Sequence, residues 1–110
     1  MICIATGLAN APFLFALGWC VYGRFSEFHL FTGNATDEDV YAGRVPWQAL
    51  KPGAPSTLQH KIRLGFLLNG VDIVGWPGGL VSAAHTPEDV SRTVDAFEAT
   101  LDLLAQEGDL

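Results

Sequence analysis

Among the side chains that could carry chemistry, the sequence offers three histidines, His29, His60 and His85. Ser82 lies three residues before His85, which is close enough to suggest a nucleophile and its base. The Gly-x-Ser-x-Gly elbow of serine hydrolases is absent around Ser82, and we expect the pair to make only local hydrogen bonds where a strand passes into a helix. No two histidines have the spacing of a metal site on one element, so the sequence does not predict zinc.

The most polar cluster of the predicted strand region consists of Arg24, Ser26, Glu27 and His29. Two interpretations are open. We favour an exposed face of a sheet, and the other is a set of groups that faces an active site across a domain boundary. On the second interpretation the cluster supplies groups on the substrate side. The substrate-side candidates of the whole chain are then Arg24, Ser26, His29, Ser82 and His85.

A predicted β-region positions the polar cluster. Trp19–Tyr22 is rich in strand-forming residues, and Glu27–Thr32 alternates polar with aromatic or aliphatic side chains. Phe28 and Leu30 therefore point to one side of a sheet. The apolar alternation changes phase between Gly23 and Ser26, which indicates a turn or a bulge there. The sequence predicts two short antiparallel strands or a single, strongly bent one.

Two less regular stretches flank this region. Ile2–Leu17 has weak helical character that Gly7 and Pro12 interrupt, so a helix either begins near Pro12 or kinks there. A chain that opens in mid-helix without a cap also suggests a truncated protein. Gly33–Pro55 has no apolar period and carries three prolines, which predicts a long loop with a short helical turn at Asp37–Ala42.

An amphipathic helix is predicted after Ser56, which is a good N-cap. Leu58, Ile62 and Phe66 recur every four residues among polar side chains, and Asn69–Gly70 closes the helix. His60 falls on its polar face, where we expect it to be solvated.

The rest of the sequence predicts a hairpin followed by a long helix. Val71–Val74 is predicted as a strand, Trp76–Gly79 as a tight turn and Leu80–Ala84 as the returning strand. Thr86 caps the last helix, which Gly108 ends. Its apolar stripe, with steps of three and four residues, consists of Val90, Val94, Phe97, Leu101 and Leu104.

Size and composition limit the classes of function. A chain of 110 residues forms a single domain, Met1–Leu110. Hydrophobic residues make up 49 % and charged residues only 16 %, which indicates either a rich core or an apolar surface that meets a partner. The net charge of −6, without a basic stripe, argues against nucleic-acid binding. No apolar run is long enough to span a bilayer, so we expect no membrane insertion.

Two further features bear on the compartment. Met1–Leu17 lacks the basic segment and the cleavage site of a signal peptide. Cys3 and Cys20 do not have metal-ligand spacing, and we expect them to be reduced thiols. The sequence therefore predicts a cytoplasmic protein.

Three segments resemble the C-terminal end of the class III aminotransferases that use pyridoxal phosphate, especially the branch around glutamate-1-semialdehyde aminomutase. Val21–Phe31 is similar to the first hairpin of that family's small domain, and Leu64–Asp72 is similar to its helix ending before a strand. Val81–Val90 is similar to the aminomutase signature, in which Ser-x-x-His-Thr precedes an acidic helix start. The order and spacing of the segments carry the resemblance, which covers nearly the whole chain.

The resemblance implies an α+β fold: the small C-terminal domain of fold-type I aminotransferases, with a mainly antiparallel sheet of three or four strands and helices packed on one face. It also implies that this domain packs on a large cofactor-binding domain of the same chain, missing here. The enzyme of this family is usually a homodimer, and it acts on small amino or keto acids. Its cofactor is pyridoxal phosphate, which a Schiff-base lysine of the large domain holds.

The groups that perform the family's chemistry have no counterpart in this sequence. Neither Lys51 nor Lys61 matches the Schiff-base motif, so we expect no catalytic residue and no bound cofactor in this chain alone. Leu80–Ser82 lacks the arginine of many transaminases, which favours the aminomutase-like branch. The turn Trp76–Gly79 is shorter than the Phe-Glu-Ala loop of true aminomutases, so mutase and transaminase both stay open. The alternative of another class is an independent small α+β binding or interaction module without catalysis.

Overall fold

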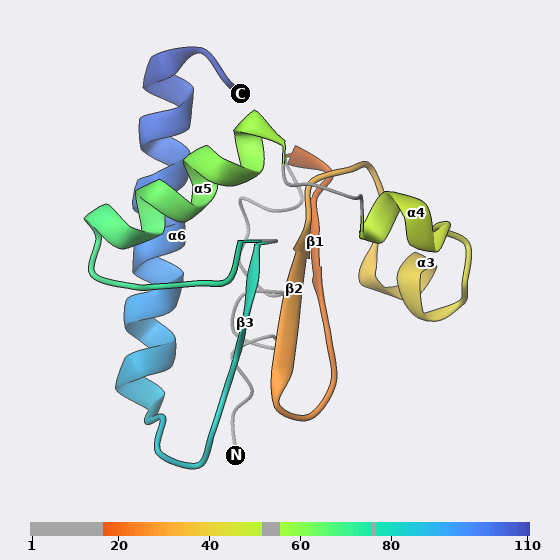
Figure 1. The fold of residues 1–110 in the computed structure, drawn as a ribbon, viewed down its shortest axis with the longest axis horizontal. Coiled ribbons are helices and arrows are strands. Elements are labelled where there is room, and N and C mark those ends of the chain that lie inside the picture. The colour runs from red at the N-terminus through yellow and green to blue at the C-terminus, as the bar shows by residue number, and fades with distance from the viewer. Residues whose placement is uncertain (1–16, 52–55, 76) are drawn as a thin grey trace.

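The computed structural model describes residues 17–51, 56–75 and 77–110. Their elements form an α+β fold, in which a three-stranded antiparallel sheet lies beside two longer helices and two short ones (Figure 1). The expected fold class is therefore confirmed. The helix predicted over Ile2–Leu17 falls outside the described residues, except at Leu17.

Three short strands make the sheet, in the order β1 (Cys20–Tyr22), β2 (Glu27–Phe31) and β3 (Gly78–Leu80). β1 and β2 are two separate strands, and the turn between them has the predicted position. Within it, Gly23 has a φ of 145° and Phe25 a φ of 61°. A side chain at Gly23 would collide with the backbone of β2, so this turn requires glycine.

The two longer helices, α5 (Thr57–Leu68) and α6 (Pro87–Glu107), both begin at the predicted caps. Ser56 and Thr86 each accept a hydrogen bond from a backbone N–H in the first turn, and a side chain of that turn accepts one from the N–H of the cap. Gly108 ends α6 in the left-handed conformation, with a φ of 81°.

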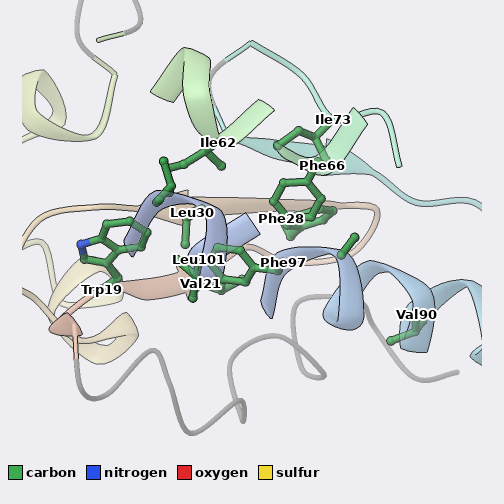
Figure 2. Close-up of a cluster of buried hydrophobic side chains, with 12 residues drawn as sticks. Trp19, Val21, Phe28, Leu30, Ile62, Phe66, Ile73, Val90, Phe97 and Leu101 are labelled. Carbon is green, nitrogen blue, oxygen red and sulfur yellow. The ribbon is translucent and has the colours of Figure 1, made fainter. Parts of the chain in front are cut away.

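The core lies between one face of the sheet and these two helices (Figure 2). Val21, Phe28 and Leu30 are buried on this face, as the alternation of the strands predicts. They belong to one cluster with Trp19 and with apolar side chains of α5, of the segment between α5 and β3, and of α6: Ile62, Phe66, Ile73, Val90, Ala96, Phe97, Leu101 and Leu104. The expected packing of the long helices on one face is therefore present.

The prediction of a strand over Val71–Val74 is wrong. In this segment Val74 makes only an isolated bridge, to Gly78. Val71 donates its N–H to the carbonyl of Phe66 at 3.0 Å, at the end of α5. The helix end thus takes a backbone donor that a strand would need for its own ladder.

The returning strand, predicted over Leu80–Ala84, is displaced along the chain. β3 covers Gly78–Leu80 and pairs with β2 rather than with a neighbouring hairpin strand. Val81 still donates its N–H to the carbonyl of Ser26 at 2.7 Å. The chain then leaves the sheet because hydrogen bonds within Ser82–His85 fold it into a turn before α6.

The segment predicted as a long loop, Gly33–Pro55, contains two short helices in its described part. α3 (Asp37–Tyr41) matches the predicted helical turn and begins at a capping box on Thr36. α4 (Trp47–Leu50) has no counterpart in the prediction, because this single turn has no side-chain cap and no apolar period. Both lie beside β1, away from α5 and α6 (Figure 1).

Candidate functional site

The face of the sheet turned away from the core borders a hollow of about 380 Å³. Tyr22 and His29 lie opposite each other in the β1–β2 register, and their rings stack with centroids 5.0 Å apart. Tyr41 from α3 and Trp47 from α4 contribute further walls. Because strand side chains alternate, the pattern that buries Phe28 in the core turns its neighbour His29 toward this hollow.

Tyr41 is fixed to the end of β1 by its hydroxyl group. This group accepts a hydrogen bond from the N–H of Gly23 at 2.8 Å and donates one to the carbonyl of the same residue at 2.9 Å. At the start of α3, hydrogen bonds from the Thr36 backbone and from Arg44 lower the pKa of Asp39 to about 2. The capping box and the tyrosine clamp together give α3 a defined position against the sheet.

Four ionisable side chains line the hollow with these aromatic walls: Arg24, Glu27, His29 and Lys51. The guanidinium of Arg24 lies over the ring of Tyr41, 4.8 Å from its centroid. The carboxylate of Glu27 is 3.6 Å from Nε2 of His29. Burial lowers the pKa of His29 below its ordinary 6.5, and the charge of Lys51 lowers it as well, against the opposing effect of Glu27. At neutral pH the imidazole is therefore neutral, and the charged groups are two cations and one carboxylate.

Ser82 and His85 lie in the loop between β3 and α6. Nδ1 of His85 accepts a hydrogen bond from the backbone N–H of Ser82 at 2.9 Å, and Oγ of Ser82 accepts one from the N–H of Ala84 at 3.2 Å. Because that ring nitrogen already accepts a backbone hydrogen bond, it is not free to take the hydroxyl proton. The expected local hydrogen bonds are confirmed, although both residues follow the strand rather than end it.

A second hollow, of about 280 Å³, lies beside β3 and is lined by His85, Gly79 and Thr93 among others. Arg63 and Asp72 also line it, and they form an ion pair at 3.3 Å. Their charges compensate each other, so this hollow has no unbalanced charge to offer a ligand.

The structure does not bring the five substrate-side candidates into one pocket. Arg24 and His29 line the first hollow, and His85 lines the second. Ser26 and Ser82 are exposed on the connections that follow β1 and β3. Both connections lie at the same end of the sheet (Figure 1). Arg24, Ser26, Ser82 and His85 thus share an end of the sheet, whereas His29 lies in the middle of β2, and the five form no single catalytic cluster.

The described residues do not form a site for pyridoxal phosphate. Nζ of Lys61 is held by Asp109 at 2.8 Å and by Glu107 at 2.9 Å, which raises the pKa of Lys61 and keeps the amine protonated. Lys51 is exposed at the rim of the first hollow. Nε of Arg63 is the one buried polar side-chain atom without a partner among the described residues. Arg63 lines the second hollow, and no lysine lines that hollow. Neither lysine is therefore a desolvated amine of the kind that a Schiff-base site needs.

Sequence reasoning missed several residues that line the first hollow, among them Tyr41, Trp47 and Lys51. The capping box that begins at Thr36 is a local signal that could have located α3 more firmly. No local signal indicates that this helix returns to the sheet, because Tyr41 bonds to Gly23, which lies 18 residues earlier.

No protein-family model matches the sequence, and a search of the curated proteins finds no match either. No helix in the described part of the chain combines the length and the apolar character needed to cross a bilayer. Within the same residues, no group of three or more histidine, cysteine or acidic side chains is arranged to hold a metal ion.

Proposed function

We propose that this chain is the small C-terminal domain of a pyridoxal-phosphate-dependent transaminase or aminomutase of class III, close to the glutamate-1-semialdehyde aminomutase branch. In that enzyme it closes over the active site of a larger domain and supplies polar groups on the substrate side. The reaction moves an amino group on or between small amino and keto compounds. By itself the chain transfers no amino group, since its lysines do not fit the cofactor.

One observation carries the proposal: two connections at one end of the sheet present the polar candidates together. Arg24 and Ser26 lie on the connection after β1, and Ser82 and His85 lie on the connection after β3. The N–H of Val81 donates to the carbonyl of Ser26 at 2.7 Å and joins the two. A domain that closes over a neighbouring active site needs polar groups on such exposed connections, held by a rigid sheet.

Exposed apolar side chains offer surface for the larger domain. Phe25, between β1 and β2, is 90 % exposed and keeps the positive φ described above. A strained residue of this kind is more common at functional contacts than elsewhere. Leu64 and Leu68 are 58 % and 78 % exposed and lie four residues apart on α5, and Leu80 at the end of β3 is 72 % exposed. Covering them would remove from water an apolar surface that the chain alone leaves exposed.

The proposal extends to the whole enzyme. It includes pyridoxal phosphate bound by a lysine of the larger domain, a homodimeric assembly and a cytoplasmic location. The thiol of Cys20, which is free and buried, accords with a reducing compartment.

The test is to recover the native polypeptide with an antibody against α6 and to determine its mass and sequence. We expect a longer chain with a lysine that borohydride reduction links covalently to pyridoxal phosphate, found by peptide mapping. The 110-residue chain expressed alone is the control, and it should carry no such label. A native polypeptide without any further domain, or a chain that is labelled and active alone, would refute the proposal.

A second function, from a different class, is favoured by the closed core. Phe97 and Ile62 are 1 % and 0 % exposed within this chain itself, which is what an independent α+β binding module requires. On that hypothesis the native polypeptide carries no cofactor, and the isolated chain unfolds in one cooperative transition in urea. The mass and cofactor content of the native polypeptide distinguish the two, since only the first hypothesis expects a larger domain with bound pyridoxal phosphate.

A further inference from the structure

We propose that the hollow between β1, β2 and the α3–α4 segment binds a small aromatic carboxylate, whose anionic group pairs with Arg24 and Lys51 and whose ring packs on Trp47. This inference goes beyond the proposed function, because it needs only residues of this chain and does not depend on a larger domain.

The first argument is the distribution of unpaired cations. The chain has six lysines and arginines, and three of them form ion pairs: Arg44, Lys61 and Arg63. All twelve acidic side chains belong to the described residues, and none of them pairs with Arg24 or Lys51 within 4.0 Å. Of the three cations without an ion pair, Arg24 and Lys51 line the same hollow, whereas Arg92 lies on α6. In a protein with a net charge of −6, such a convergence of positive charge favours an anion at this place.

The second argument is the shape and the character of the walls. Tyr22, Tyr41 and Trp47 present aromatic surface, and the hollow of about 380 Å³ falls within the usual range for small-ligand sites. Trp47 is 70 % exposed, which leaves a large flat side chain in water that a planar ligand would cover. Flat apolar walls with cations at the rim match a ligand that has a ring at one end and a carboxylate at the other.

The third argument concerns orientation. Glu27 is the one carboxylate of the lining, and its 3.6 Å approach to His29 places it on the β2 side of the hollow. Two cations against one anion leave the lining one unit positive, and the carboxylate of a ligand is attracted to Arg24 and Lys51 and repelled by Glu27. Removing the glutamate charge must therefore strengthen binding, whereas removing either cation must weaken it.

The test uses the full 110-residue chain with benzoate as the probe and its uncharged isostere benzamide as the matched ligand. Titration is followed by the backbone amides and the tryptophan indole signals in nitrogen–proton NMR spectra. We expect benzoate to shift the signals of β1, β2 and the Trp47 indole, with saturation, and benzamide to bind more weakly.

Charge variants then identify the site. Arg24→Gln and Lys51→Gln should each weaken benzoate binding about two- to fivefold, the range typical of exposed charge pairs. Glu27→Gln should strengthen it by a similar factor. The matched control is Arg92→Gln, which removes a cation from the exposed face of α6 and should leave the affinity unchanged. Because all four positions are exposed, the NMR spectra of the variants should show the same fold.

Three results would overturn the inference. Equal binding of benzoate and benzamide would exclude recognition of the carboxylate. Benzoate shifts that map to the second hollow around His85 would place the site elsewhere. A Glu27→Gln variant that binds benzoate more weakly than the wild type would contradict the assigned orientation.

Discussion

Replacing Tyr41 with phenylalanine removes one oxygen atom and with it both hydrogen bonds that hold α3 against the turn after β1. These bonds are 2.8 and 2.9 Å long and lie at an exposed position, where water replaces part of their energy. A protein hydrogen bond contributes about 0.5–1.5 kcal/mol net, and at an exposed site we take the lower end, about 1 kcal/mol for the two. The ring remains, so the contact of Arg24 with it, at 4.8 Å, is preserved.

Amide hydrogen exchange at Gly23 measures this loss where it occurs. A change of about 1 kcal/mol accelerates exchange about fivefold at this amide, whereas amides of α6 should change only as much as the global stability does. The wall that α3 gives to the hollow also loses its anchor, so we expect Tyr41→Phe to bind benzoate more weakly than the wild type.

Tyr22→Phe is the matched control for this prediction. It removes the same atom from the same hollow, but the hydroxyl of Tyr22 makes no hydrogen bond with the residues that the structure describes. If the two variants accelerate exchange at Gly23 to the same degree, the clamp does not hold α3, and the reasoning is wrong.

Three further predictions test packing, electrostatics and thiol burial. A methyl group at Gly65 would collide with the fully buried Thr100 where α5 crosses α6. Overpacking costs about 2–3 kcal/mol, and the higher helix propensity of alanine returns about 1 kcal/mol. Gly65→Ala should therefore lower the free energy of unfolding, measured in urea, by about 1–2 kcal/mol. The loss should be smaller in a Thr100→Ala background, and a variant as stable as the wild type would contradict the close crossing. Hydrogen bonds, of which the one from the Thr36 backbone has the largest effect, lower the pKa of Asp39 from 3.8 to about 2. The stability that this carboxylate contributes is therefore present above pH 3.8 and is lost as the pH falls to about 2. NMR titration of the carboxyl, with Asp39→Asn as the insensitive reference, measures this, and an ordinary pKa would refute it. Burial, with help from nearby carboxylates, raises the pKa of Cys20 to about 11, so iodoacetamide at pH 8 should label this thiol only after urea is added. Peptide mapping separates its label from that of Cys3, and rapid labelling of Cys20 in the native chain would argue against the burial.

The parts of the fold that the sequence predicts are those decided by neighbouring residues. The caps of α5 and α6 are local, because Ser56 and Thr86 need only side chains and N–H groups of the first helical turn. The faces of β2 are equally local, since alternation alone buries Phe28 and Leu30. The same holds for the hydrogen bonds that Ser82 makes next to its own position in the chain.

Strand pairing is where local reasoning fails. Val71–Val74 has good strand composition, but the end of α5 takes the N–H of Val71 for its own closure. β3 begins at Gly78, a residue with poor strand propensity, because a side chain there would collide with the backbone of β2 and glycine permits the close approach. The pairing partner, and not the propensity of the segment, therefore determines which residues form the third strand.

The first hollow depends partly on local sequence patterns and partly on contacts between residues far apart in the chain. Its two sides therefore differ in how well the sequence predicts them. Alternation places His29 on the face away from the core, so the β2 side of the hollow follows from the sequence. Its α3 side depends on the clamp between Tyr41 and Gly23, a contact across 18 residues that no local pattern encodes. Because Arg24 comes next to Gly23 and lies over the ring of Tyr41, the same contact places one of the two cations that line the hollow. If α3 were not held there, Arg24 and Lys51 would lose their common wall. The anion site that we propose would then be two separate surface charges, and so its affinity should depend on a tyrosine hydroxyl that never touches the ligand.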